Sequence, residues 1–283
     1  MAETIDGFQV IRKVADSQSA EIFLAKRTAG RGRGKEYALK VLRPAFADDL
    51  LYHEYLENEY RICSALNHPN LIRVHEVVLD SKRPHLVMDY VPGQSLRDCL
   101  ARERPNISAA LSWLVEVADG LNYFHDQGYV HRDVKSQNII IAEGSPVRVI
   151  DFALARRQDT TLSQRLMSRL FERRRPGTWS YMSPEQILNE PLTGQSDVYG
   201  LGVTLYECLT GRMPFTAEDP QDLLRQHLWA AAPSPRMLRP EVPIELDDFV
   251  RAMLAKDPLD RPHGMEYLSG KLRAFSAACN DID

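Results

Sequence analysis

The most informative stretch of this sequence reads His131-Arg132-Asp133-Val134-Lys135-Ser136-Gln137-Asn138, with Asp151-Phe152-Ala153 thirteen residues further on. It confines two carboxylates, a lysine and a carboxamide to two short polar loops beside brief apolar segments that predict strands. Asp133 can accept a proton from a hydroxyl group, and Lys135 can neutralise charge on a transferring phosphoryl group. A solvated loop with incidental charges is the alternative, but the ordered run of polar positions argues against it.

The same stretch contains candidate metal ligands. Asn138 and Asp151 offer hard oxygen atoms, which suit Mg²⁺ and, through it, the phosphates of a nucleotide. The residues therefore indicate phosphoryl transfer between a nucleotide and a hydroxyl group.

Composition narrows the class of protein. The chain has 283 residues, of which 35 are basic, 39 are acidic and 44 % are apolar, with a formal net charge of -4. This apolar share excludes a disordered chain, and the charge balance gives no electrostatic case for nucleic acid or an anionic membrane as the main partner. The length suggests about two domains or one large bilobal unit. The sequence does not indicate an oligomeric state.

Four widely spaced cysteines form no C-x-x-C pair, which favours a reducing compartment over a disulfide framework or a metal cluster. The first eight residues lack the apolar core of a signal peptide. The longest apolar run, residues 198–206, is less than half of the ~20 residues that a membrane-spanning helix requires. We therefore expect a cytoplasmic protein. The cysteines are Cys63, Cys99, Cys208 and Cys279.

Hydrophobic spacing predicts a small β-rich part followed by a larger helical part, with the join near residues 88–93. Ser108 is the expected N-cap of a helix over residues 109–127, which Gly128 ends. The other expected strands are residues 8–14, 20–26, 37–42, 71–79, 85–90, 138–142 and 147–150. The other expected helices are residues 48–66, 184–188, 196–210, 220–229, 244–255 and 262–277.

These segments, in this order, resemble the eukaryotic-type serine/threonine protein kinase family over roughly residues 8–275. Tyr37-Ala38-Leu39-Lys40 is similar to the strand that carries the nucleotide-contacting lysine, and Glu59 lies where the family places the acidic partner of that lysine. The resemblance implies an α+β, bilobal fold. It implies a single kinase domain over residues 1–283, with an N-lobe at 8–90 and a C-lobe at 91–276.

The resemblance also assigns roles. Lys40, held by Glu59, would position the phosphates of ATP, Asp151 and Asn138 would bind Mg²⁺, and Asp133 would orient and deprotonate the substrate hydroxyl. Lys135 and Thr178 flank the aspartate in kinases that act on Ser or Thr. An ordinary turn hydroxyl is the alternative for Thr178.

A similar correspondence outlines an adenine pocket. Met88 resembles the residue behind the adenine ring, and Asp89 and Val91 resemble the hinge whose backbone binds adenine. The residues expected to enclose the ring, which are also plausible core aliphatics, are Ile22, Ala38 and Ile140. The residues that match the buried hydrophobic spine of the family are Cys63, Val74, His131 and Phe152.

Later motifs agree with the same family. Ser183-Pro184-Glu185 closes a segment that begins at Asp151, as the kinase activation segment does. Asp197 opens a helix that resembles the buried scaffold helix of the large lobe, and Arg261 is expected to pair with Glu185. Solvated surface charges are the alternative for that pair.

Two departures favour a pseudokinase as the alternative. The three positions expected to hold glycine in the phosphate-binding loop are occupied by Ala15, Ser17 and Ala20, and Ala153 replaces the glycine after Asp151-Phe152. The Gly30-Arg31-Gly32-Arg33-Gly34 run lacks the G-x-G-x-x-G spacing and predicts a basic hairpin turn.

The expected activation segment is rich in arginine, and it contains hydroxyl groups that could accept phosphate and then pair with Arg132. An ordinary solvated loop is the alternative, and a basic segment could also attract acidic substrates. The candidate phosphate acceptors are Thr160, Thr161, Ser163 and Ser168. The expected activity is transfer of the ATP γ-phosphate to protein Ser or Thr residues, including autophosphorylation. The alternatives are a pseudokinase that binds nucleotide or regulates a partner and, more distantly, a small-molecule phosphotransferase.

Overall fold

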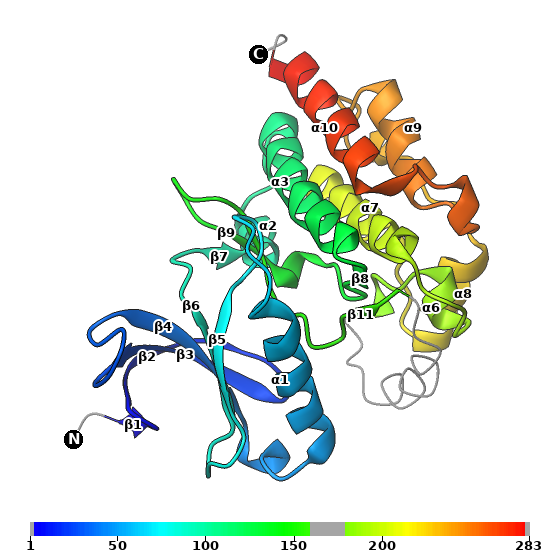
Figure 1. Cartoon of the computed structure of the whole chain (residues 1–283). Coiled ribbons are helices and arrows are strands. Elements are labelled where there is room, and N and C mark those ends of the chain that lie inside the picture. Colours follow the sequence, from blue (N-terminus) through cyan, green and yellow to red (C-terminus); the bar gives the residue numbers. More distant parts are fainter. Residues whose placement is uncertain (1–2, 159–178, 281–283) are drawn as a thin grey trace. The chain divides into compact units, whose positions relative to one another are not determined.

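The computed structural model describes residues 3–158 and 179–280, which fall into two compact units (Figure 1). The first unit comprises Met1–Gly93 with Ile150–Leu154, and the second comprises Gln94–Val149 with Ala155–Asp283. The chain passes from the first unit to the second after Gly93, which is the last residue of the boundary predicted at residues 88–93. A single domain over residues 1–283 stays a prediction.

A six-stranded sheet forms most of the first unit, and every neighbouring pair is antiparallel. Five of the six strands occur where alternation predicted them, although their ends differ by a few residues, and the strand predicted over 71–79 covers only five residues. The short first strand, Thr4–Ile5, was not predicted. In spatial order the strands are β1 (Thr4–Ile5), β2 (Phe8–Asp16), β3 (Ala20–Arg27), β4 (Glu36–Leu42), β6 (His85–Asp89) and β5 (Val74–Val78).

Strand β4 divides its side chains between the two faces of the sheet. Tyr37, Leu39 and Val41 point into the apolar core of the unit, whereas Ala38 and Lys40 lie on the opposite face. This alternation is what brings a charged lysine to one face of a strand whose other face is fully buried. The remaining core residues are Ile5, Phe8, Phe23, Ala25 and Val87.

Helix α1 (Leu50–Cys63) follows the short helix η1 (Pro44–Phe46) and is shorter than the predicted 48–66. It begins where the Asp49 carboxylate accepts a hydrogen bond from Leu51 N at 3.0 Å, which satisfies one of the unpaired N–H groups of the first turn. Its buried face carries Leu56 and Ile62 together with the charged Glu59.

The second unit is mainly helical, and α10 packs along α3 (Figure 1). The structure corrects the predicted start of α3, because Asn106 and not Ser108 is the N-cap. Gly128 ends this helix with φ +78°, as predicted. The helices are α2 (Leu96–Arg102), α3 (Ile107–Asp126), η2 (Ser136–Asn138), α6 (Pro184–Ile187), α7 (Gly194–Thr210), α8 (Pro220–Trp229), η3 (Pro235–Met237), α9 (Ile244–Met253), η4 (Pro258–Asp260) and α10 (Gly264–Asn280).

Helix α7 is the centre of this unit, since every residue from Ser196 to Thr210 is buried. Gly200 permits the helix to approach the loop at Val134, because an added Cβ would lie 2.8 Å from the Val134 carbonyl oxygen. Short strands surround the loop in two small antiparallel sheets. These strands are β7 (Gln94–Ser95), β9 (Ile139–Ile141) and β10 (Arg148–Val149) in one sheet, and β8 (Tyr129–Val130) and β11 (Arg156–Arg157) in the other.

The structure describes two features that relate to the environment of the chain, namely the character of its helices and the state of its cysteines. Within residues 3–158 and 179–280, no helix combines the length and the apolar character needed to cross a bilayer. The thiols of Cys63, Cys99 and Cys208 are free, in agreement with the absence of a disulfide framework.

Candidate functional site

An ion-pair network in the first unit joins Lys40 to Glu59, its predicted partner, and to Asp151, which was predicted as a metal ligand. Lys40 Nζ lies 2.7 Å from Glu59 Oε2 and 2.8 Å from Asp151 Oδ1. Burial acts to lower the pKa of Lys40, but the negative charges of Asp151 and Glu59 outweigh it and raise that pKa. The lysine is therefore a fixed cation held by strand β4, helix α1 and the segment after β10.

Helix α1 also fixes the backbone of the Asp151-Phe152-Ala153 motif. Glu59 Oε1 accepts a hydrogen bond from Phe152 N at 3.2 Å, and Asn58 Nδ2 donates to the Ala153 carbonyl at 3.1 Å. Asp151 has φ +65°, whereas Ala153 is outside the positive-φ region. Alanine in the third position thus fits this backbone without strain, and the strained residue of the motif is the aspartate itself.

Three of the predicted adenine-pocket residues, Ile22, Ala38 and Met88, lie on the Lys40 face of the sheet, whereas the Asp89 side chain lies on the Tyr37 face. Ile22 pairs with Lys40 across β3 and β4, and Ala38 pairs with Met88 across β4 and β6. Asp89 N donates to a neighbouring backbone carbonyl within the unit, so the Asp89 carbonyl is the group left for the predicted hinge contact. Val91 follows β6, and Ile140 belongs to β9 of the second unit.

The turn between β2 and β3, where glycines were expected, is closed by side chains. Ser17 N donates to the Ala20 carbonyl at 2.8 Å, and Ser17 Oγ accepts from Ala20 N at 3.0 Å. Asp16 pairs with Lys13 at 2.9 Å and with Arg43. No residue of this turn has a positive φ, so its conformation does not require glycine.

The loop before η2 gathers the second set of predicted residues. Asp133 Oδ2 accepts from Lys135 Nζ at 2.6 Å and from Asn138 Nδ2 at 3.0 Å, and Asn138 Nδ2 also donates to the Asp133 carbonyl at 2.9 Å. Asp133 is 9 % exposed, so its carboxylate is held in one orientation with little competition from water. This arrangement presents a base beside a cation, which is suited to accepting a proton from a hydroxyl group.

Asp197 supports that loop, a role that the sequence analysis missed. Its carboxylate accepts hydrogen bonds from His131 N and Arg132 N, each at 2.8 Å, and pairs with His125 Nε2 at 2.8 Å. Burial acts to raise the pKa of Asp197, but the bond from His125 and the charges nearby lower it. Arg132 has φ +70°, and these bonds offset a strain of about 1–3 kcal/mol at that residue. The sequence feature that could have revealed this role is a carboxylate in the first turn of a helix whose other residues are mostly apolar.

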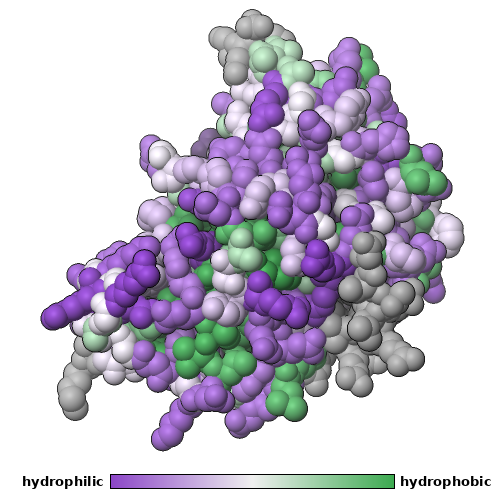
Figure 2. Space-filling view, in the orientation of Figure 1, coloured by the Kyte–Doolittle hydropathy of each residue, from purple (hydrophilic) through white to green (hydrophobic). Residues whose placement is uncertain are grey.

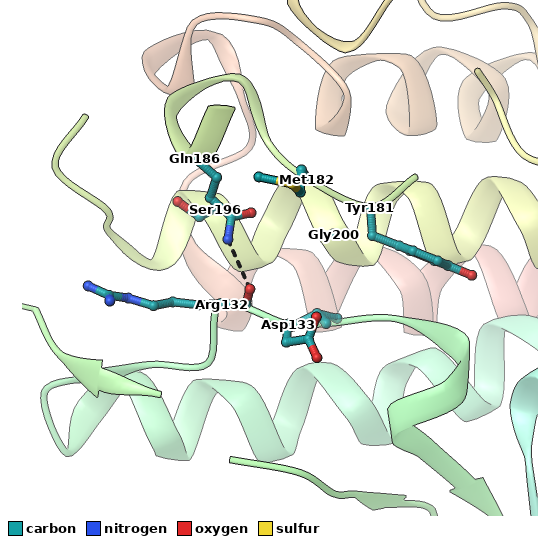
Figure 3. Close-up of a pocket in the computed structure, with 8 residues that line it drawn as sticks. Arg132, Asp133, Tyr181, Met182, Gln186, Ser196 and Gly200 are labelled. Atoms are coloured by element: carbon teal, nitrogen blue, oxygen red, sulfur yellow. Dashed lines mark hydrogen bonds between the residues drawn. The ribbon is translucent and has the colours of Figure 1, made fainter. Parts of the chain in front are cut away.

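Tyr181 and Gln186 connect the same loop to the segment that precedes α7. Gln186 Nε2 donates to the Arg132 carbonyl at 2.9 Å (Figure 3). Tyr181 OH donates to Glu207 Oε2 at 2.6 Å and lies 2.8 Å from Ser136 Oγ. The cavity among these residues has a volume of about 10 Å³, which is room for a single water and not for a substrate group.

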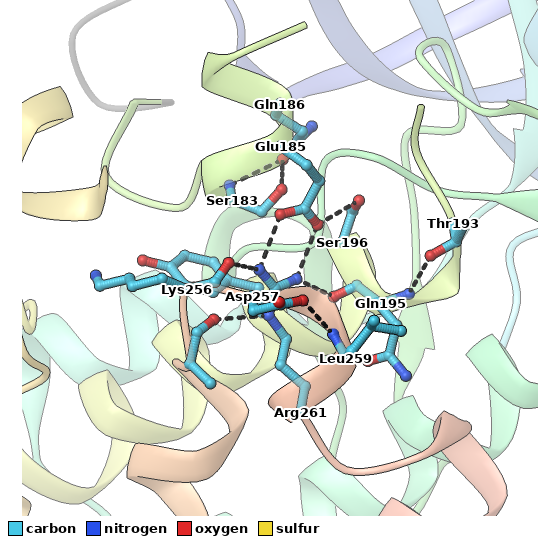
Figure 4. Close-up of polar contacts among 12 residues, drawn as sticks. Ser183, Glu185, Gln186, Thr193, Gln195, Ser196, Lys256, Asp257, Leu259 and Arg261 are labelled. Carbon is cyan, nitrogen blue, oxygen red and sulfur yellow. Dashed lines mark hydrogen bonds and ion pairs between the residues drawn. The ribbon is translucent and has the colours of Figure 1, made fainter. Parts of the chain in front are cut away.

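The predicted ion pair between Glu185 and Arg261 is confirmed (Figure 4). The two side chains make a bidentate contact with both N–O distances at 2.8 Å, and the Arg261 side chain is fully buried. Arg261 also donates to three backbone carbonyls, and Ser196 Oγ donates to Glu185 at 2.8 Å. Burial acts to raise the pKa of Glu185, but Arg261 lowers it. The pair ties the Ser183-Pro184-Glu185 motif to the loop around η4.

The predicted site residues thus form two clusters, one in each unit, and Thr178 lies outside the described residues. The same is true of Thr160, Thr161, Ser163 and Ser168. The first cluster includes Lys40, Glu59 and Asp151, and the second includes Asp133, Lys135 and Asn138. The spine residues Cys63, Val74, His131 and Phe152 are each at most 1 % exposed.

The candidate metal ligands have suitable chemistry. Asn138 donates to Asp133 through its amide nitrogen, so the amide oxygen is the atom that could ligate a cation. Asp151 supplies a carboxylate, the harder of the two ligand types. Among the described residues, no group of three or more His, Cys, Asp and Glu side chains gathers as a metal site. Each of these two ligand types, a carboxylate and an amide oxygen, suits Mg²⁺.

Comparison with known proteins gives a consistent result. A family model described as a protein kinase domain matches residues 8–272. The chain is 30 % identical over 272 residues to the serine/threonine-protein kinase PrkC of Bacillus subtilis and 35 % identical over 233 residues to PknB of Mycolicibacterium smegmatis. These alignments cover 95 % and 80 % of this chain but only 41 % and 36 % of the relatives.

Solved structures give the same fold. The kinase domain of PknI from Mycobacterium tuberculosis superposes with a TM-score of 0.72 at 23 % identity, and the match covers 97 % of this chain and 98 % of that one. The predicted α+β fold with a β-rich and a helical part is therefore confirmed. The comparisons give no support to the pseudokinase alternative.

Proposed function

Because this chain belongs to the protein kinase family, we propose that it is a serine/threonine protein kinase, which transfers the γ-phosphoryl group of ATP to Ser or Thr hydroxyls of protein substrates. The observation that carries the proposal is the orientation of Asp133, whose carboxylate is held 2.6 Å from Lys135 and 3.0 Å from Asn138. The names of the relatives support Ser and Thr as acceptors.

In the proposed reaction, Asp133 accepts the proton of the substrate hydroxyl as its oxygen attacks the γ-phosphorus of ATP. A new P–O ester bond forms, the bond between the γ-phosphorus and the bridging oxygen breaks, and ADP leaves with the electron pair of that bond. Lys135 stabilises the charge that develops on the transferred group, because its ammonium is already beside the reacting carboxylate.

The first unit contributes nucleotide binding in this proposal. Lys40 contacts the phosphates while Glu59 and Asp151 hold it in place. Asp151 would hold Mg²⁺, which would neutralise phosphate charge, and Asn138 of the second unit offers an amide oxygen as a further candidate ligand. In the first unit, the adenine ring would be received by the Lys40 face of the sheet and by the backbone at the end of β6, through Ile22, Ala38, Met88, Asp89 and Val91. We place the reaction in the cytoplasm, which supplies ATP and keeps thiols reduced.

The test is incubation of the purified chain with labelled ATP, Mg²⁺ and a generic basic protein. We expect label on Ser and Thr of the substrate or of the chain itself. Asp133→Asn is expected to lower the rate of labelling about 100-fold or more, because general-base catalysis contributes about that much to the rate. Asp222→Asn, which alters an exposed carboxylate on α8, is the matched control and is expected to leave the rate unchanged.

Equal labelling by the unaltered chain and by Asp133→Asn would contradict the proposed activity. A thermal-shift titration with ATP, with and without Mg²⁺, separates that outcome from a failure to bind nucleotide. Stabilisation by ATP without labelling would indicate a nucleotide-binding scaffold, whereas no shift at millimolar ATP would also remove the assigned nucleotide site.

A further inference from the structure

The basic hairpin that joins β3 to β4 has a left-handed backbone conformation that favours glycine at three positions. Gly30, Gly32 and Gly34 have φ values of +76°, +85° and +82°. At Gly32 an added Cβ would lie 2.5 Å from the Tyr37 hydroxyl oxygen, so the backbone is pressed against that ring. The glycine-rich run therefore forms a defined turn packed against Tyr37. The proposed kinase chemistry makes no use of this turn.

A cavity of about 560 Å³ opens between this hairpin and strand β5, entirely within the first unit. Its volume is in the range of sites for small molecules or peptide side chains, and it is much larger than a single bare phosphate needs. Figure 2 shows strongly hydrophilic side chains gathered at the hairpin end of β3 and β4. The charged residues that line the cavity are Arg27, Arg31, Lys35, Arg73, His75 and Glu76.

Positive charge exceeds negative charge in this cavity. Glu76 pairs with Arg27, and the adjacent Asp89 lies 3.6 Å from Lys35 and 2.7 Å from His75. These two carboxylates face four permanently charged cations and a histidine.

The remaining two cations have no carboxylate partner. Within residues 3–158 and 179–280, neither Arg31 nor Arg73 takes part in an ion pair, and both are exposed. Two guanidinium groups from separate segments, the hairpin and the residue that precedes β5, therefore line one cavity. Each guanidinium presents N–H donors in a fork that matches the oxygens of a phosphoryl group.

The floor of the cavity is rigid. The Arg27 guanidinium lies 4.6 Å from the centre of the Phe8 ring and 5.5 Å from that of Tyr37, and Lys35 Nζ lies 5.1 Å from the Tyr37 ring centre. Arg27 Nε is buried and has no hydrogen-bond acceptor among the described residues. A fixed and partly desolvated cation below two unpaired ones favours binding of an anion, since little side-chain entropy remains to be lost.

We propose that the cavity between the Gly30–Gly34 hairpin and β5 is a binding site for a phosphoryl group, carried either by a small polyphosphate or by a phosphorylated side chain. Arg31 and Arg73 bind the phosphoryl oxygens, and Arg27 and Lys35, each already paired with a carboxylate, complete the lining of the cavity. The site is separate from Lys40, which lies on the opposite face of β4 from Tyr37. It does not depend on the proposed kinase activity.

Isothermal titration of the whole chain with inorganic pyrophosphate and with a phosphoserine peptide tests the site. We expect binding that weakens with salt, and we expect the Arg31→Ala/Arg73→Ala double variant to lower the affinity about tenfold or more. Arg33→Ala, in the same hairpin but outside the cavity lining, is the matched control and should bind as the unaltered chain does. Both substituted arginines are exposed, so the unfolding temperature should not change.

The two probes distinguish the source of the phosphoryl group. Tighter binding of the phosphoserine peptide than of pyrophosphate, with no binding of the unphosphorylated peptide, assigns a phosphorylated side chain, and the reverse order assigns a small polyphosphate. Lys40→Met is expected to leave this binding intact. Absence of binding by both probes, equal loss with Arg33→Ala, or loss with Lys40→Met alone would overturn the proposal, and the last result would assign the anion to the nucleotide site.

Discussion

Single hydroxyl groups decide how the loop that contains Asp133 is held. Tyr181 uses its proton to bind Glu207, so the contact with Ser136 has the serine as donor. Burial is the main cause of the raised pKa of Glu207. The chain of three side chains crosses from the loop to the segment before α6 and on to α7. These hydrogen bonds satisfy polar atoms that lie in a buried environment.

We therefore expect Tyr181→Phe to lower the free energy of unfolding by about 1–3 kcal/mol, because it removes the hydroxyl group that joins Ser136 to the buried Glu207. Urea denaturation at neutral pH measures this change. Tyr267→Phe, in the exposed part of α10, is the matched control and should change stability by less than about 0.5 kcal/mol. Equal values for the two variants would show that the hydroxyl chain contributes nothing.

The start of α3 shows how an element chooses between two suitable caps. Asn106 and Ser108 are both residue types that cap helices well. Asn106 Oδ1 accepts from Ala109 N at 2.7 Å, whereas Ser108 Oγ lies 3.4 Å from Ser276 Oγ of α10. Helix α3 therefore begins at Ile107, and packing against α10 gives the serine a different environment.

Asn106→Ala is expected to destabilise the chain by about 1 kcal/mol, since the first turn of α3 would lose its side-chain acceptor. Ser108→Ala should cost less than half as much. Chemical denaturation of both variants side by side provides the measurement. A larger loss for Ser108→Ala than for Asn106→Ala would restore the serine as the functional cap.

Buried ionisable groups connect the stability of the whole molecule to pH. His227 is fully buried, and its Nδ1 lies 2.8 Å from Tyr199 OH. Burial, with a smaller contribution from Lys256, lowers the pKa of His227 to about 3. The folded chain keeps this histidine neutral, whereas the unfolded chain would protonate it near pH 6.5. Because the unfolded state binds the extra proton, stability is lost as the pH falls below 6.5.

His227 should contribute a loss of about 2 kcal/mol in the free energy of unfolding between pH 7 and pH 5, because only the unfolded state titrates over that interval. His227→Gln should show a smaller difference between the two pH values, whatever its stability at pH 7. His263→Gln, an exposed histidine, should keep the full difference. Urea titrations at both pH values check this, and an unchanged difference in His227→Gln would refute the assignment.

Local sequence patterns were sufficient to predict many of the helices and strands and the contacts within the loop that contains Asp133. Helix α8 has the predicted bounds, 220–229, because Asp219 and Pro220 mark its start within the sequence itself. The contacts of Asp133 with Lys135 and Asn138 join residues at most five positions apart, so the spacing alone could indicate them. Family resemblance extended this to the Glu185–Arg261 pair, whose members are 76 residues apart.

The sequence by itself determined the strands and helices, the chemistry of the polar loops and the family, because these depend on periodicity and on residue types at short spacing. Only the tertiary structure decided that Asp197 binds the loop amides, that Ser17 and Asp16 close the turn without glycine, and that the basic hairpin faces Arg73. Each of these depends on which backbone atoms and charges from distant segments meet, and a hydrogen bond or ion pair between such segments leaves no periodic trace in the sequence.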